Sequence, residues 1–125
     1  MARADALAMA RAYLLNRPEL GLSADTCSVD VPDPRPARFV RLMDSGSERR
    51  TIVHRDSRVT VEAWNAAGSA AAKQDAEDVY AALDEWELVP DWDGWPSGPY
   101  AQPDPGTGTP RYVMTCLIRH RMETP

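Results

Sequence analysis

The sequence predicts an α+β fold, an antiparallel sheet of about four strands with two helices packed on one of its faces. Two observations support this prediction. Apolar residues recur at helical spacing in two separate segments, 2–16 and 69–86. Segments with strand character lie between and after them, in the region 27–64 and at 111–120. The order helix, strands, helix, strand is typical of one domain, here residues 1–125.

Each predicted helix has an apolar face and a signal at one of its ends. In the first, Leu7, Ala10 and Leu14 repeat at helical spacing, and Pro18 supplies a stop. In the second, Ser69 is the expected N-cap. Its apolar stripe consists of Ala72, Ala76, Val79, Leu83 and Trp86. Both helices therefore have a face that needs a sheet to cover it.

The strand region is expected to form a meander of three neighbouring strands. Residues 37–43 have strand character, and the stretch "DSGS" at 44–47 is expected to turn the chain. Residues 49–53 then pair back on the first strand. The stretch "RVTVEAW" at 58–64 alternates apolar and polar residues with the period of a strand.

A long loop is expected at 87–109, because "ELVPDWDGWPSGPYAQPDPGTGT" contains five prolines and four glycines. Trp92, Trp95 and Tyr100 argue against disorder, since disordered segments contain few large aromatic residues. Two alternatives remain open. The aromatic rings fold back over the second face of the sheet, or the loop is an arm whose tryptophans anchor it to a neighbouring protein.

The composition of the second sheet face indicates that the protein associates with another subunit. Both faces of the expected sheet are partly apolar, and two helices cover only one of them. The other face needs a long loop or another subunit to cover it. The sequence therefore favours an oligomer.

Charge is distributed in two blocks along the chain. Residues 35–58 contain seven arginines and three acidic residues, whereas residues 74–104 contain nine acidic residues and no basic one. Two unlike, complementary surfaces allow head-to-tail association, and such a contact forms a ring when its rotation closes. The alternative is that each block is only a solvated face. The net charge of −5 argues against general attraction to nucleic acid or to anionic membranes.

No catalytic, metal-binding or cofactor-binding motif is found in the sequence. His54 and His120 are the only histidines, and they lack the paired spacing of metal ligands. "DWDGW" at 91–95 begins like a calcium loop, but its glycine comes too early and Gln102 stands where a glutamate is needed. We expect no bound metal, no cofactor and no enzyme. The alternative is an arginine-lined pocket with His54 as acid or base.

Two further features concern the location of the protein. Charged residues interrupt the first twenty positions, which argues against a signal peptide and a membrane span. Cys27 and Cys116 are expected to be small buried apolar residues, with a single disulfide as the alternative.

Four stretches, taken in order, resemble tail terminator proteins of long-tailed double-stranded DNA phages of actinobacteria. They are "VPDPRPARFVRL" at 31–42, the paired basic residues Arg49 and Arg50, "RVTVEAWNAAGSAAAKQDAEDVYAAL" at 58–83 and "PDPGTGTPRYVMTCLIRHR" at 103–121. Together they span most of the chain. The sequence departs from this family in its turn, "DSGSERR", which is usually richer in glycine. Its "DWDGWPSGPY" loop is richer in tryptophan than expected.

The resemblance implies a structural virion protein that is not an enzyme. Such a protein forms a hexameric ring on the finished tail tube, stops tube polymerisation and presents a surface to the head connector. Its implied partners are copies of itself, the major tail tube protein and the head–tail connector protein. DNA only passes through the lumen, and no membrane is involved. The implied location is the head-proximal end of the virion tail, after assembly in the host cytoplasm. Another neck protein, a head–tail adaptor or tail-completion protein, is the alternative.

On this interpretation the arginines contact carboxylates of a neighbouring subunit or of the tube in bidentate geometry. Prolines before the strand at 37–43 keep its approach extended and prevent it from pairing with another strand there. The predicted interface consists of Arg35, Arg38, Arg41, Arg49, Arg50, Arg58, Asp84, Glu85, Glu87, Asp91, Trp92, Asp93, Trp95 and Tyr100.

Overall fold

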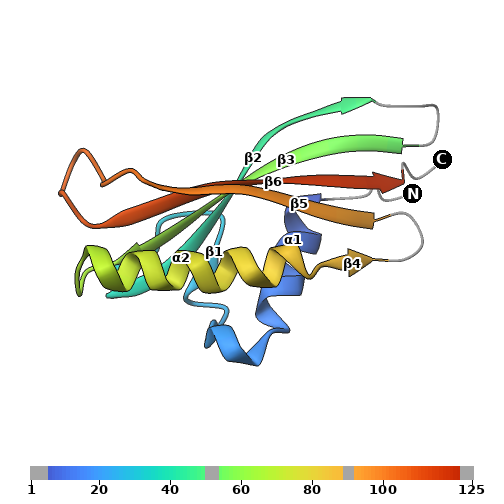
Figure 1. Ribbon diagram of the computed structural model, residues 1–125. Helices are drawn as coiled ribbons and strands as arrows, with labels where there is room; N and C mark the ends of the chain where they lie inside the picture. Colours follow the sequence, from blue (N-terminus) through green and yellow to red (C-terminus); the bar gives the residue numbers. More distant parts are fainter. Residues whose placement is uncertain (1–5, 50–53, 89–91, 122–125) are drawn as a thin grey trace.

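The computed structural model describes residues 6–49, 54–88 and 92–121 of the chain. It contains one six-stranded sheet in the order β1-β2-β3-β6-β5-β4. Both α-helices lie on the same face of this sheet (Figure 1). The predicted α+β class and the placement of the helices are confirmed, but the described sheet has six strands where about four were expected.

The elements follow the predicted order, with additions. The first part of the chain contains α1 (Ala6–Leu15), a 3-10 turn η1 (Pro18–Leu20), β1 (Cys27–Ser28), β2 (Arg38–Arg49) and β3 (His54–Asn65). The second part contains α2 (Ser69–Asp84), β4 (Glu87–Leu88), β5 (Trp92–Ala101) and β6 (Arg111–Arg121). All described strand pairs are antiparallel except β1 with β2.

The predicted turn at 44–47 is wrong. These residues lie inside β2, which runs to Arg49 and pairs with β3 from Arg38↔Asn65 to Arg49↔Arg55. The register shifts between Asp44 and Gly46, and the Asp44 side chain accepts a hydrogen bond from the Gly46 backbone N–H. The glycine therefore serves a β-bulge within the long pairing of β2 with β3. Of the predicted strand at 49–53, residues 50–53 lie outside the described residues.

The predicted long loop at 87–109 is also wrong over much of its length. Residues 92–101 form β5, which pairs with β6 from Asp93↔Arg119 to Ala101↔Tyr112. On its other side β5 pairs with β4 only at Asp93 and Trp92. The rest of that edge has no strand partner in the described chain, so Pro96 and Pro99 are tolerated there. Within the described part of 87–109, the connection from 102 onwards, which continues to 110, is irregular or turn-like.

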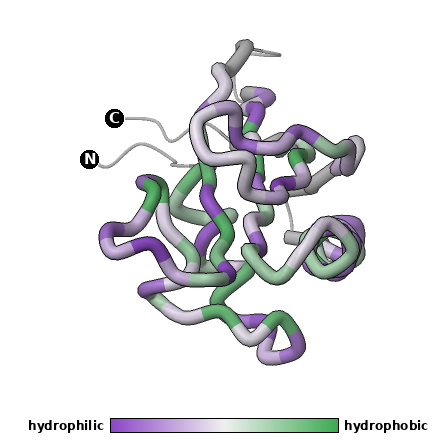
Figure 2. Tube along the Cα trace, turned by 90° about the vertical axis from the view of Figure 1, so that its left-hand side faces the viewer, coloured by the Kyte–Doolittle hydropathy of each residue, from purple (hydrophilic) through white to green (hydrophobic). Residues whose placement is uncertain are grey.

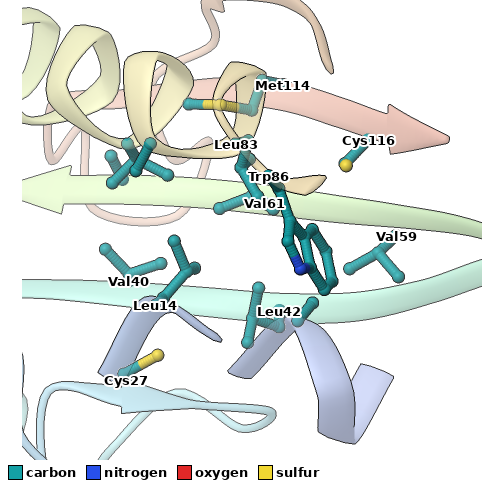
Figure 3. Packing of buried hydrophobic residues seen from close by; sticks show 14 of the residues in the cluster. Leu14, Cys27, Val40, Leu42, Val59, Val61, Leu83, Trp86, Met114 and Cys116 are labelled. Carbon is teal, nitrogen blue, oxygen red and sulfur yellow. The ribbon is translucent and has the colours of Figure 1, made fainter. Parts of the chain in front are cut away.

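The main core lies between the sheet and the two helices. Figure 3 shows Val40 and Leu42 of β2, Val59 and Val61 of β3, and Met114 of β6 facing side chains from the helix layer. The predicted apolar stripe of α2 faces this core and is buried. Trp86 lies beyond the end of α2, but the residue is 2% exposed and its ring stacks on Tyr13 with 4.7 Å between ring centroids. The ring joins the two helices at this end.

The two cysteines are free and buried. Cys27 lies in β1 and Cys116 in β6, and β2 and β3 lie between those strands. Three strand spacings separate the two residues by at least about 14 Å, which is too far for a disulfide. The disulfide alternative is therefore wrong. Burial raises the pKa of the Cys27 thiol, so it stays protonated as a small core residue.

No helix in the described part of the chain is long and apolar enough to cross a membrane.

Candidate functional site

The sheet face opposite the helices is called the open face. Alternation and register place on it Phe39, Arg41 and Met43 of β2, Arg58, Thr60, Glu62 and Trp64 of β3, Tyr100 of β5, and Arg111, Val113, Thr115 and Leu117 of β6. No described helix covers it. One end contains a buried cluster of charged and aromatic residues, and the rest is partly exposed.

Glu62 lies at the centre of the buried cluster and is 6% exposed. Arg41 Nη1 lies 3.5 Å from Glu62 Oε1, and Arg111 Nη1 lies 3.4 Å from Oε2. The indole N–H of Trp64 donates to Oε1 at 3.2 Å. The buried carboxylate is thus bound from three sides by the chain itself, as a buried charge requires.

Trp64 is enclosed by other side chains of the same cluster. Its ring stacks on Phe39 with 5.0 Å between centroids and 21° between planes. The guanidinium carbons of Arg35 and Arg111 each lie 5.0 Å from the Trp64 ring centroid. Phe39 and Trp64 are 1% and 2% exposed. Cation–π contacts therefore help to cover an aromatic pair on the sheet face that no described helix covers.

Two connections meet over this end of the open face. Arg35, from the proline-rich segment before β2, donates from Nη1 to the Thr107 hydroxyl at 3.3 Å. The same nitrogen lies 4.0 Å from Asp104 Oδ2 in the connection before β6. Asp104 in turn accepts hydrogen bonds from the Thr107 hydroxyl at 2.7 Å and from its backbone N–H at 3.0 Å. The expectation that a loop covers the second face applies to this end, through residues 102–110.

A pH effect follows from this turn. The hydrogen bond from the Thr107 hydroxyl, followed by the one from its backbone N–H, lowers the pKa of Asp104. A depressed carboxyl pKa contributes stability above its unfolded value of about 3.9, which is lost as the pH falls through the folded value. We expect the melting temperature of Asp104→Asn to fall less between neutral and acidic pH than that of the wild type, because asparagine has no carboxylate to protonate. Thermal melts of both proteins at several pH values measure this difference, and NMR titration of the wild type follows the Asp104 carboxyl. If the melting temperatures of the two proteins fell equally with pH, the prediction would be contradicted.

Several predicted interface residues are bound by their own chain. Arg38 Nε lies 2.9 Å from Asp75 Oδ2 of α2, and Arg38 Nη2 donates to the Leu20 carbonyl at 2.7 Å. Arg17 Nη2 lies 2.5 Å from Glu85 Oε2. Arg35 and Arg41 contact Asp104 and Glu62 in the same way, so all these pairs join elements of one subunit.

Three others are exposed. Arg58 and Asp84 have no ion-pair partner among the described residues. The Tyr100 residue is 53% exposed. The structure places Arg49, Glu87, Trp92, Asp93 and Trp95 in strands, without describing their side chains. Arg50 and Asp91 lie outside the described residues. Because the side chains of Trp92 and Trp95 are not described either, their role in covering the sheet or binding a partner stays a prediction.

The centre of the cluster was missed from the sequence. Neither Glu62 nor Arg111 was among the predicted interface residues, although Glu62 is the one charged residue between Val59 and Trp64. An acidic residue inside an alternating strand was the available signal, since a charge there needs a partner on a neighbouring strand. Among the described residues, no group of three or more His, Cys, Asp and Glu side chains is placed to hold a metal ion.

Comparison with known proteins shows the fold. No protein-family model and no curated protein matches the sequence. Among solved structures, the chain is similar to one from the "Virion of native gene transfer agent (GTA) particle", with a TM-score of 0.64 and 19% identity. The match covers 97% of this chain and 100% of that one. The two chains therefore share their fold over almost their whole lengths.

Proposed function

We propose that this chain is a structural virion protein, a tail terminator that forms a hexameric ring on the tail tube. The observation that carries the proposal is the fold likeness, over almost the full length of both chains, to a chain from a gene transfer agent virion. In this role the ring stops polymerisation of the major tail tube protein. Its other side is the docking surface for the head connector.

The open face supports an assembly role. Beyond the buried cluster it exposes Tyr100 and Arg58, and no described element covers this part. Such a partly apolar sheet surface is stabilised when another protein covers it. By contrast, Arg35, Arg38 and Arg41 bind acceptors of their own chain, which gives no support to an arginine-lined catalytic pocket.

A head–tail adaptor or tail-completion protein is the second candidate, because the same fold likeness supports any structural neck component. The two candidates differ in what a particle lacks without the protein. A terminator limits tail length, whereas an adaptor joins a finished tail to a head.

Deletion of the gene in the particle-producing host separates these roles. For a terminator we expect overlong tails of widely varying length, because nothing stops growth of the tube, and electron microscopy of lysates measures that length. Expression of the wild-type chain from a plasmid is the control and should restore uniform tails. Tails of normal length without heads would support the adaptor instead, and normal particles would refute both.

A further inference from the structure

We propose that the open face of one copy binds the outer face of α2 of a second copy. The inference rests on the proposed function and identifies the two surfaces that meet between neighbours in the ring. Outer face here means the exposed side of α2 formed by Glu77, Asp78, Ala81 and Asp84.

The outer face of α2 is acidic. Glu77, Ala81 and Asp84 lie four and three residues apart, so they share one side of the helix, opposite the buried stripe. Figure 2 shows α2 end on, with hydrophilic residues beside the hydrophobic ones of its buried side. Glu77 and Asp84 have no ion-pair partner in the described part of the chain. The alanine between the two acids lets another surface approach the helix closely.

These two carboxylates differ from others of the same helix region. Asp75 is bound by Arg38, and Glu85 by Arg17. The subunit therefore pairs Asp75 and Glu85 with its own arginines and leaves Glu77 and Asp84 exposed without such a partner among the described residues. Carboxylates of this kind gain most from a basic surface on another molecule.

The open face offers that complement. Among the side chains that the structure describes, four arginines lie on or over it, Arg35, Arg41, Arg58 and Arg111, with three acids, Asp56, Glu62 and Asp104. Arg41 and Arg111 contact Glu62, and Arg35 contacts Asp104. Of these four arginines, Arg58 is the one without an ion-pair partner among the described residues, and it is exposed. Tyr100, 53% exposed on the same face, adds an aromatic ring of the type common in protein interfaces.

The two surfaces lie on opposite sides of the molecule, since α2 packs on the sheet face away from the open one (Figure 1). One copy can therefore bind one neighbour through each surface. A repeated contact of this heterologous kind forms a closed ring if its rotation closes. Each sheet then gains a helix on its second face, as two-sided sheets commonly have.

Two variants that each damage one surface test the proposal. The open-face variant contains Arg58→Glu and Tyr100→Ala, and the helix variant contains Glu77→Arg and Asp84→Arg. Circular dichroism first establishes that both fold, and sedimentation then measures their association. We expect each variant alone to associate about tenfold or more weakly than the wild type.

The equal mixture of the two variants gives the decisive measurement. The intact α2 of the open-face variant meets the intact open face of the helix variant, so we expect a one-to-one heterodimer of near wild-type affinity. A single pair of variants controls for charge reversal as such. Asp84→Arg alone should weaken association, whereas Asp25→Arg, which reverses another exposed acid before β1, should leave association unchanged.

Three results would overturn the proposal. They are a helix variant that associates like the wild type, a mixture that stays monomeric, and a wild type that is monomeric up to its solubility limit. The first would mean that open faces pair with each other. This test can fail independently of the tail-length experiment. If the mixture formed a heterodimer but gene deletion left tails normal, the interface would stand and the terminator role would be refuted.

Discussion

Replacing Glu62 with leucine is expected to cost about 3 kcal/mol of folding free energy, because a buried charge network loses its centre. The substitution removes the carboxylate that Arg41 and Arg111 contact from two sides. It also leaves the indole N–H of Trp64 without its acceptor, at a ring that is 2% exposed. Urea unfolding monitored by tryptophan fluorescence measures the change in free energy.

Two variants make this result interpretable. Glu62→Gln retains an oxygen that can accept from Trp64 but loses the charge, so it should cost less than leucine. Glu77→Leu makes the same chemical change on the exposed side of α2 and should shift stability by less than about 0.5 kcal/mol. If Glu62→Leu were as mild as Glu77→Leu, the network would contribute nothing to the fold.

The arginines of the basic block thus divide into two groups. Arg38 and Arg41 stabilise the subunit, since each binds an acid on another element of the same chain. Reversing Arg38 to glutamate would place two carboxylates together at Asp75, so it would disturb folding as well as any assembly. Arg58 is exposed and unpaired among the described residues, which makes it the cleaner position for testing an interface.

The helices were predictable because local periodicity determines them. The expected helix at 69–86 is observed as Ser69–Asp84, and the expected strand at 111–120 as Arg111–Arg121. The stretches 44–47 and 92–101 were not predictable in the same way. Their glycines and prolines indicate turns and loops locally, but tertiary pairing places one in a β-bulge and the other in a strand near the sheet edge.

The site was harder to predict for a related reason. Arg41 meets Glu62 only because β2 and β3 pair in a register that places them opposite each other. A turn at 44–47 implies a different register, so the partner of Arg41 could not be found from the sequence. The sequence shows the block of arginines. Which of them form ion pairs within the subunit and which are exposed depends on contacts between segments that are distant in the sequence.

The Gly98→Ala substitution is expected to cost about 2–4 kcal/mol, from backbone strain and a close contact together. Gly98 has a φ of +106°, which L-residues rarely adopt, and it lies at the register shift between Ser97 and Tyr100. An added Cβ would lie 3.1 Å from the Val113 carbonyl oxygen and 3.3 Å from Met114 Cα, both backbone atoms of β6. Backbone in a paired strand cannot move aside without breaking the ladder.

Gly46→Ala separates the two causes. Gly46 has a φ of +113° at the other bulge, but nothing lies within 4 Å of the added Cβ, so this variant should incur only the strain, about 1–2 kcal/mol. Urea unfolding of both variants measures the difference, and amide hydrogen exchange along β5 and β6 locates it. We expect faster exchange in β6 near Val113 for Gly98→Ala alone. Equal costs for the two alanines would mean that β5 moves away from β6 freely, so that the bulge does not fix the position of Tyr100 on the open face.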